Sequence, residues 1–221
     1  MANDKLFRKR KERAAKDMAR RRDALSPYDK VLIVCEGAKT EKYYFDELAK
    51  SYDINSHNIK IVGGGGSPTN IAKMAETQYK AGKKDRIPFD KVYCVFDKNS
   101  HADYQRALAQ LENKEDFEAI VSVPCFEYWL LLHYCDSAKP YEKRGSKSAC
   151  DQVISELKTH IPRYEKGGKN IFSRVEENLD TAIANAKSTL KAAQKSGTDN
   201  PSTKVHLLVE YLQNISRPPR R

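Results

Sequence analysis

Four short apolar runs, each followed by a segment with helical spacing, constrain most strongly what this chain can fold into. The runs cover residues 30–35, 59–62, 91–96 and 119–123 and are rich in β-branched side chains. Continuous apolar runs of this length are typical of strands that are buried on both faces of a sheet. Strands that alternate with helices favour parallel pairing through right-handed crossovers. The sequence therefore predicts an α/β fold with a mostly parallel sheet flanked by helices.

Helices are predicted in the segments that follow these strands. Thr40 is the expected cap of the first helix, and Ser67 with Pro68 marks the expected start of the second. A third helix is predicted over residues 104–113, and an aromatic one over F-E-Y-W-L-L-L-H-Y after the fourth strand. The glycines at 63–66 are interpreted as a mobile turn, with contact to a phosphate backbone as the second reading, because no G-K-[ST] follows them.

The remainder of the chain is predicted to be helical from about residue 146. A helix through Leu157, a long helix from Val175 to Leu190 and a last amphipathic helix over 204–215 are expected. The predicted organisation is a basic N-terminal tail (1–27), an α/β core (28–135), a helical C-terminal part packed on that core (136–216) and a basic tail (217–221).

The positive charge of the chain is concentrated in the two tails. The formal net charge is +10, of which residues 1–24 supply +6 and the last five residues +3, so the body is nearly neutral. Such tails attract phosphate backbones without reading sequence, and Arg20, Arg21 and Arg22 are the candidate nucleic-acid contacts within them. The alternative is a solvated tail that only aids solubility.

The spacing of the cysteines and the short apolar runs predict a soluble protein in a reducing compartment. A chain of 221 residues can bury a core without disulfides, and its five cysteines form no C-x-x-C pair. We expect them to be unpaired, buried thiols in a reducing compartment, and we expect no zinc site. No apolar run approaches the ~20 residues of a membrane-spanning helix, and the N-terminus lacks an apolar signal region, so a soluble cytoplasmic protein without a membrane partner is predicted.

Acidic residues follow three of the predicted strands. Glu36 follows the first strand, Asp97 the third, and Glu127 lies shortly after the fourth. Because ligands of open α/β sheets bind at the carboxyl ends of the strands, these side chains are expected to converge. Carboxylates are the ligands of hard cations, which predicts a Mg²⁺ or Mn²⁺ site. The alternative is that Glu36 and Asp97 only cap helices.

The same segments resemble a known family. V-L-I-V-C-E-G followed by T-E, and V-F-D-K-N after a later strand, resemble the Toprim domain of topoisomerases, primases and related nucleases. Four ordered motifs resemble the RloB family of Toprim-like proteins over about residues 30–212: I-V-C-E-G-A-K-T-E-x-x-Y-F, V-F-D-K-N-S-H, P-C-F-E-Y-W-L-L-L-H and N-P-S-T-K-V-H-x-L-V-E. The resemblance implies a Toprim-like (Rossmann-like) fold and a magnesium-dependent endonuclease of bacterial phage defence (abortive infection), often encoded beside an AAA- or ABC-type ATPase.

The resemblance assigns roles to individual residues. Glu36 matches the Toprim glutamate that acts as general acid or base, and Asp97 matches the first metal-binding aspartate. The second aspartate of the Asp-x-Asp motif is replaced by Asn99, a neutral ligand that holds a cation less tightly. Either Asp103, Glu41 or Glu127 supplies the missing charge, or the metal site is weakened.

The candidate nucleic-acid contacts of the body surround these motifs. They are Lys39, Lys98, His101 and Lys166. The competing hypothesis is a non-catalytic nucleic-acid-binding or sensor subunit that partners an ATPase. The choice among DNA, tRNA and other RNA as target stays open, as does homo-oligomerisation.

Overall fold

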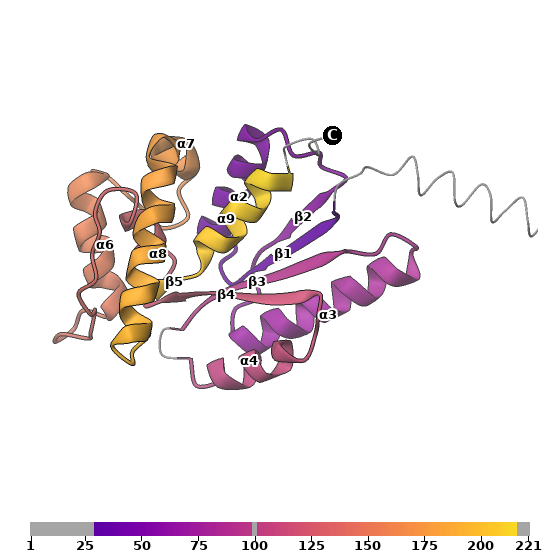
Figure 1. Ribbon diagram of the computed structural model, residues 1–221, viewed down its shortest axis with the longest axis horizontal. Helices are drawn as coiled ribbons and strands as arrows, with labels where there is room; N and C mark the ends of the chain where they lie inside the picture. The colour runs from indigo at the N-terminus through magenta and orange to yellow at the C-terminus, as the bar shows by residue number, and fades with distance from the viewer. Residues whose placement is uncertain (1–28, 99–100, 216–221) are drawn as a thin grey trace, which may run out of the picture.

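The computed structural model describes residues 29–98 and 101–215. These residues form a central five-stranded sheet with helices around it (Figure 1). The strands are β1 (Val31–Cys35), β2 (Ile59–Val62), β3 (Lys91–Asp97), β4 (Phe117–Val123) and β5 (Ser202–Thr203). Their order is β2-β1-β3-β4-β5, with β1 to β4 parallel and β5 antiparallel to β4. The predicted α/β class, a mostly parallel sheet flanked by helices, is confirmed.

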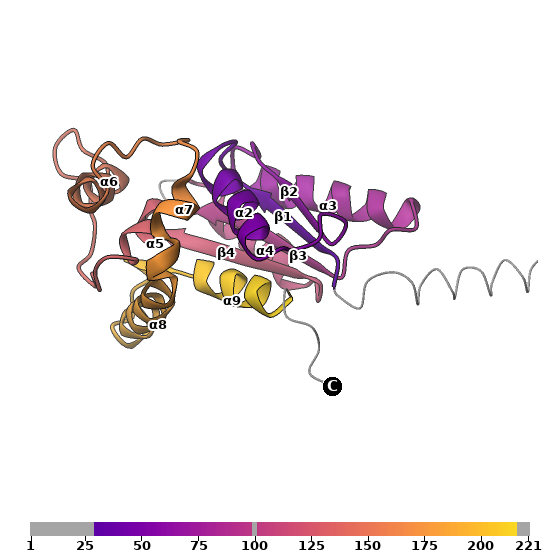
Figure 2. The ribbon, with the colours of Figure 1, turned by 90° about the horizontal axis from the view of Figure 1, so that it is seen from above.

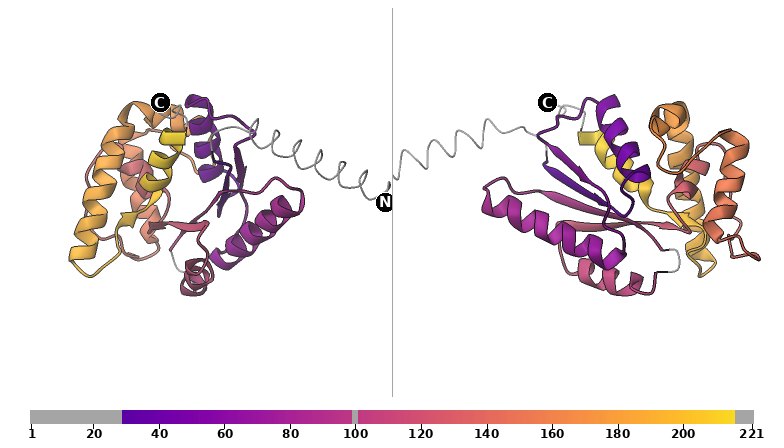
Figure 3. Two further views of the ribbon diagram at one scale, coloured as in Figure 1. Left: turned by 45° about the vertical axis from the view of Figure 1, so that its right-hand side comes forward. Right: turned by 180° about the vertical axis from the view of Figure 1, so that it is seen from behind.

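Helices cover both faces of the sheet and gather beyond the carboxyl ends of its strands (Figures 1 and 2). They are α2 (Thr40–Ser51), α3 (Pro68–Lys84), α4 (Tyr104–Glu112), α5 (Glu127–Leu131), α6 (Ala149–His160), α7 (Ile171–Val175), α8 (Leu179–Lys195) and α9 (Val205–Ile215). Helices α3 and α4 lie on one face, and α2 and α9 on the other (Figure 3). The helical C-terminal part, with α6 and α8, lies beside the ends of β4 and β5.

Alternate side chains of each strand enter two separate cores, which explains the continuous apolar runs of the sequence. Leu32 of β1 and Cys94 of β3 pack against α3 and α4. Ile33 of β1 and Val95 of β3 belong to a larger core, which α2, α9 and the C-terminal helices complete around Trp129.

The polar break before the last helix contributes β5, which the sequence analysis did not expect. The hydroxyl groups of Ser122 and Thr203 lie 2.9 Å apart across the β4–β5 pair, and the Lys204 amide donates to the Val121 carbonyl at 2.9 Å. A strand of two residues is too short to show a periodicity in the sequence.

Three local predictions are wrong. The aromatic helix is only the five residues of α5, followed by a turn. The predicted long helix is divided into α7, a 3₁₀ turn (Glu176–Asn178) and α8. Helix α7 begins ahead of the predicted Val175 because the carboxylate of Glu47 in α2 accepts hydrogen bonds from the amides of Asn170 at 2.6 Å and Phe172 at 2.9 Å.

The third error concerns Thr40, which is the first residue of α2 and not its cap. Its hydroxyl accepts a hydrogen bond from the amide of Gly167 at 2.8 Å and so joins α2 to the loop before α7. Helices α3, α4 and α9 begin within one residue of their predicted starts.

Several predictions fall outside the described residues. They concern the two tails, with Arg20, Arg21 and Arg22, and Asn99. No helix in the described part of the chain is long and apolar enough to cross a bilayer.

Candidate functional site

Acidic residues from neighbouring strands and helices lie near one another at the carboxyl end of the sheet. Glu36 directly follows β1, Asp97 ends β3, and Glu127 begins α5 after β4. Since β1, β3 and β4 are adjacent and parallel, these positions share one edge. Glu41 of α2 joins them: the charges of Glu41, Glu127 and Glu36 all raise the pKa of Asp97.

Glu36 is held between β1 and the segment that follows β3. Its Oε2 accepts a hydrogen bond from the Asp97 amide at 2.9 Å, and its Oε1 lies 2.9 Å from Nε2 of His101. The side chain of Glu36 is 17% exposed. The carboxylate is therefore oriented by the backbone on one side, and a titratable ring faces its other oxygen.

Asp97 is costly to ionise. Burial, followed by the charges of Glu41, Glu127 and Glu36, holds the pKa of its carboxyl well above the ordinary value, and Lys166 acts in the opposite direction. Carboxylates that repel one another at a strand edge are stabilised by a bound cation, because its charge offsets both the desolvation and the repulsion. The chemistry of this donor set fits a hard dication such as Mg²⁺ or Mn²⁺.

Glu41, like Glu127, is a buried member of this group. It is 7% exposed, and burial, with smaller contributions from the charges of Glu127 and Glu36, raises its pKa. A Cβ at Gly37 would lie 2.1 Å from Oε2 of Glu41, so the glycine allows this carboxylate to approach the turn after β1. Of the three acids expected to replace the missing charge, the structure brings Glu41 and Glu127 to Asp97.

Asp103, the third, is engaged elsewhere. Its Oδ2 accepts hydrogen bonds from the Thr69 hydroxyl at 2.6 Å and the Thr69 amide at 3.1 Å. These contacts, the hydroxyl first, lower the pKa of Asp103 to about 2. The carboxylate thus fastens the start of α4 to the start of α3, on the face of the sheet opposite α2.

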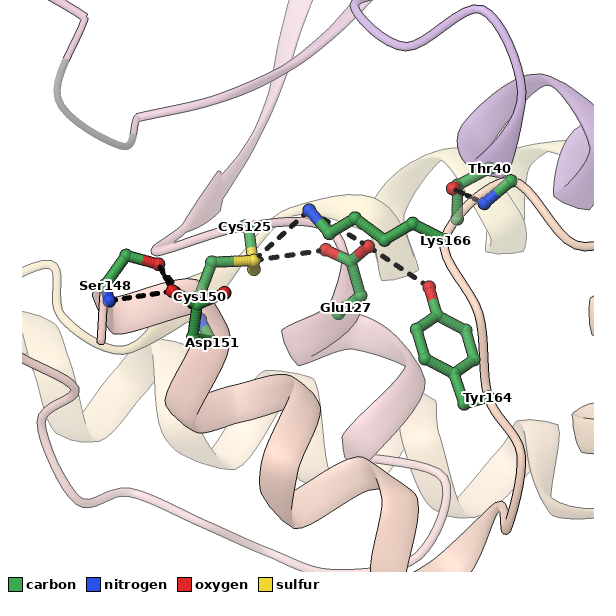
Figure 4. A network of polar contacts seen from close by, with 9 residues as sticks. Thr40, Cys125, Glu127, Ser148, Cys150, Asp151, Tyr164 and Lys166 are labelled. Carbon is green, nitrogen blue, oxygen red and sulfur yellow. Dashed lines mark hydrogen bonds and ion pairs between the residues drawn. A yellow bond between two sulfur atoms is a disulfide. The ribbon is translucent and has the colours of Figure 1, made fainter. Parts of the chain in front are cut away.

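Glu127 lies at the junction of the sheet and the C-terminal helices (Figure 4). It is 2% exposed; its Oε1 accepts a hydrogen bond from the Tyr164 hydroxyl at 3.1 Å and lies 3.3 Å from Nζ of Lys166. Burial and the charge of Glu127 raise the pKa of Tyr164 far above its ordinary value. Sequence reasoning did not single out Tyr164, because only the folded chain brings its loop against α5.

The cysteine prediction is wrong for one pair. Cys125, just before α5, and Cys150 in α6 form a disulfide with Cα atoms 5.8 Å apart, and Cys35, Cys94 and Cys135 are free. The sequence separation of 25 residues gives no signal for this pairing, which arises because α5 packs against α6.

The candidate nucleic-acid contacts lie around the acidic edge. Lys39 is exposed, and its side chain runs beside Gly167, in the same loop as Lys166. Lys98, next to Asp97, pairs with Asp199 in the loop before β5. His101 is the ring beside Glu36, and Lys166 is 55% exposed although it contacts Glu127.

The carboxylate oxygens are not gathered around a single point. Across residues 29–98 and 101–215, one group of three ligand atoms lies within 4.8 Å, and it consists of Cys125, Glu127 and Cys150. A dication at the strand ends would thus require the carboxylates to turn toward it. Asn99, the remaining expected ligand, is outside the described residues.

These features define an α/β protein with a cluster of carboxylates at the carboxyl end of a mostly parallel sheet. Residues 31–212 match the RloB-like protein family, and the chain belongs to this family. The match begins with β1 and ends within α9, so it includes every strand and the acidic edge. No curated protein and no solved structure matches the chain significantly.

Proposed function

We propose that the protein is a Mg²⁺- or Mn²⁺-dependent endonuclease that cleaves nucleic-acid phosphodiesters in bacterial phage defence by abortive infection. The observation that carries the proposal is the proximity of Glu36, Glu41, Asp97 and Glu127 at the carboxyl end of the sheet. Oε2 of Glu36 accepts a hydrogen bond from the Asp97 amide at 2.9 Å, and burial, followed by the charges of the other three, raises the pKa of Asp97. The defence role rests on the RloB-like family and its resemblance to Toprim nucleases.

The residues divide the work as follows. Asp97, with Glu41 and Glu127 near it and Asn99 two residues further along the sequence, would hold the ion, which when bound activates water and offsets charge on the scissile phosphate. Glu36, oriented by the Asp97 amide, accepts or returns a proton at Oε1, where Nε2 of His101 lies 2.9 Å away.

The substrate would be bound through its phosphates. Lys39, Lys98 and Lys166 surround the acidic edge, and each cation that contacts a phosphate adds salt-sensitive affinity. The basic tail adds the same attraction for further phosphates of the nucleic acid through Arg20, Arg21 and Arg22. The target class is DNA or RNA, tRNA included.

A cleavage assay tests the proposal. Plasmid DNA and total cellular RNA are incubated with the protein and Mg²⁺, Mn²⁺ or a chelator. We expect metal-dependent cleavage that falls by about 10²-fold or more in Glu36→Gln and Asp97→Asn. The matched control is Glu118→Gln, an exposed carboxylate of β4 that should leave the rate unchanged. Asn99→Asp should tighten metal binding and preserve or raise cleavage. Wild-type rates in the Glu36 and Asp97 variants would contradict the assignment.

One observation favours a second candidate, a non-catalytic sensor subunit that docks on an AAA- or ABC-type ATPase. The ammonium of Lys166 already lies 3.3 Å from Glu127, so that carboxylate has a counter-ion without any metal. This candidate predicts no cleavage by any variant and ATPase binding that a chelator does not change. Metal-dependent cleavage by the wild-type protein would exclude it.

A further inference from the structure

Two sulfur atoms and a carboxylate form a compact buried group where the sheet meets α6 (Figure 4). The ligand atoms of Cys125, Glu127 and Cys150 all lie within 4.8 Å of one another, and Sγ of Cys150 is 3.4 Å from Oε2 of Glu127. All three residues are buried. Three donor atoms from separate parts of the chain thus already lie close together. The carboxylates at the strand ends do not.

The donor set suits a metal different from that of the acidic edge. Thiolates are soft ligands that favour Zn²⁺ over Mg²⁺, and zinc takes mixed sulfur and carboxylate ligands. Zinc sites with three protein ligands keep a fourth position for solvent or substrate. The separation of 25 residues between the cysteines explains why the absence of a C-x-x-C pair is a poor guide here.

A second observation shows that this point stabilises a positive charge. Nζ of Lys166 lies 3.3 Å from Oε1 of Glu127 and 3.4 Å from Sγ of Cys150. The Lys166 side chain is 55% exposed, so the ammonium can move into solvent when another cation replaces it. Its departure would open the fourth position toward water.

We propose that the reduced protein binds one Zn²⁺ through Cys125, Cys150 and Glu127, with water in the fourth position, and that the disulfide is the metal-free form of this site. A dithiol reductant transfers two electrons and two protons to the disulfide, giving two thiols and an oxidised reductant. Zinc then binds the two thiolates as two protons leave. In the reverse step an oxidised dithiol takes two electrons from the two thiolates and two protons from solvent; the Cys125–Cys150 bond re-forms, both metal–sulfur bonds break and the ion is released.

This site does not rest on the proposed nuclease function, although both include Glu127. If zinc binds, Glu127 is withdrawn from the cluster around Asp97. The test therefore uses the spectrum of a bound metal and not cleavage, so that the two proposals can fail separately.

The experiment titrates Co²⁺, a spectroscopic substitute for Zn²⁺, into the full-length protein. The protein is reduced, and the reductant is then removed under anaerobic conditions. It should develop a sulfur-to-cobalt charge-transfer band that saturates at one equivalent of Co²⁺. One equivalent of Zn²⁺ should abolish this band. The oxidised protein should show none. Because this comparison uses one polypeptide in two redox states, it does not depend on the folding of a variant.

Variants locate the ligands. Cys125→Ser and Cys150→Ser should each remove the band, whereas Cys135→Ser, a free and partly exposed cysteine, should retain it. Glu127→Gln should weaken affinity beyond the ~10- to 100-fold that loss of an outer-shell partner costs. A reduced wild-type protein without the band, or a band that survives in both Cys125→Ser and Cys150→Ser, would overturn the proposal.

Discussion

Helices α2 and α5 each contribute side chains to two regions that differ in chemistry: the acidic edge and the aromatic core behind it. Helix α2 carries Glu41 at the edge and Tyr44 in the core, and α5 carries Glu127 and Trp129 in the same way. The rings of Tyr44 and Trp129 meet edge to face with centroids 6.4 Å apart, and both side chains are fully buried. At the acidic edge, by contrast, burial and the charges of Glu127 and Glu36 raise the pKa of Glu41. Burial and the charges of the same neighbours also raise the pKa of Asp97.

The difference shows how the fold separates stability from chemistry. Aromatic burial is among the largest favourable contributions to folding, whereas bringing like charges together in a partly buried place costs free energy. The core thus holds the acidic residues in an arrangement that they would not adopt unaided. Mutations in the two regions should consequently change the free energy of unfolding in opposite directions.

The largest expected effect is in the core. Trp129→Ala removes a ring that is 0% exposed and should lower the free energy of unfolding by about 3–5 kcal/mol. Trp129→Phe keeps most of the buried surface and should lose clearly less. Urea unfolding followed by circular dichroism measures both, and equal losses would show that aromatic packing is not what stabilises this region.

The next effect is a pH dependence that originates in the core. His133 is 1% exposed, its Nδ1 lies 3.0 Å from the Trp129 carbonyl, and burial lowers its pKa to about 4. The unfolded chain binds the proton at a higher pH than the folded chain, so stability is lost as the pH falls from about 6.5 to about 4. The loss attributable to this ring is about 3 kcal/mol.

The variant His133→Gln isolates this contribution. Unfolding curves at several pH values should show a smaller loss toward acid in the variant than in the wild-type protein. Burial also lowers the pKa of His206. Because His206 is present in both proteins, its contribution is the same on both sides of the comparison. Identical pH dependence in the two proteins would rule out a buried neutral His133.

The smallest expected effect has the opposite sign and lies at the edge. The folded-state pKa of Asp97 is raised, so its contribution to stability falls as the pH rises from about 4 through that pKa. At pH 7 and without metal, Asp97→Asn should therefore raise the free energy of unfolding. Asp103→Asn is the matched control: the pKa of Asp103 is lowered by Thr69, so this variant should lose stability. Destabilisation in both variants would contradict the account of the edge.

The sequence predicted the edge better than the contacts around it. Strands were evident from continuous β-branched runs, and Glu36 and Asp97 stood out because parallel strands present their ends together. The carboxylate of Glu41 reaches the edge only because Gly37 leaves room for it. This contact gives no signal in the sequence, so Glu41 was one of three candidates for the missing charge. The turn of Asp103 toward Thr69 is a tertiary contact that no local pattern reveals.

The C-terminal half shows the same limit. Helical spacing predicted its content, but the start of α7 depends on contacts with Glu47, more than a hundred residues away in sequence. The Cys125–Cys150 pair likewise depends on how α5 meets α6. Local patterns thus specify the elements, and packing specifies which side chains meet between them.

The central claim is that Asp97 and its neighbours bind a divalent cation, and calorimetric titration of Mn²⁺ tests it most directly. The protein is kept oxidised so that Cys125 and Cys150 are unavailable as ligands. We predict saturable Mn²⁺ binding to the wild-type protein and to Glu118→Gln, and a loss of affinity of about tenfold or more in Asp97→Asn. Equal Mn²⁺ affinity in the wild-type protein and Asp97→Asn, or no binding to either, would contradict the account.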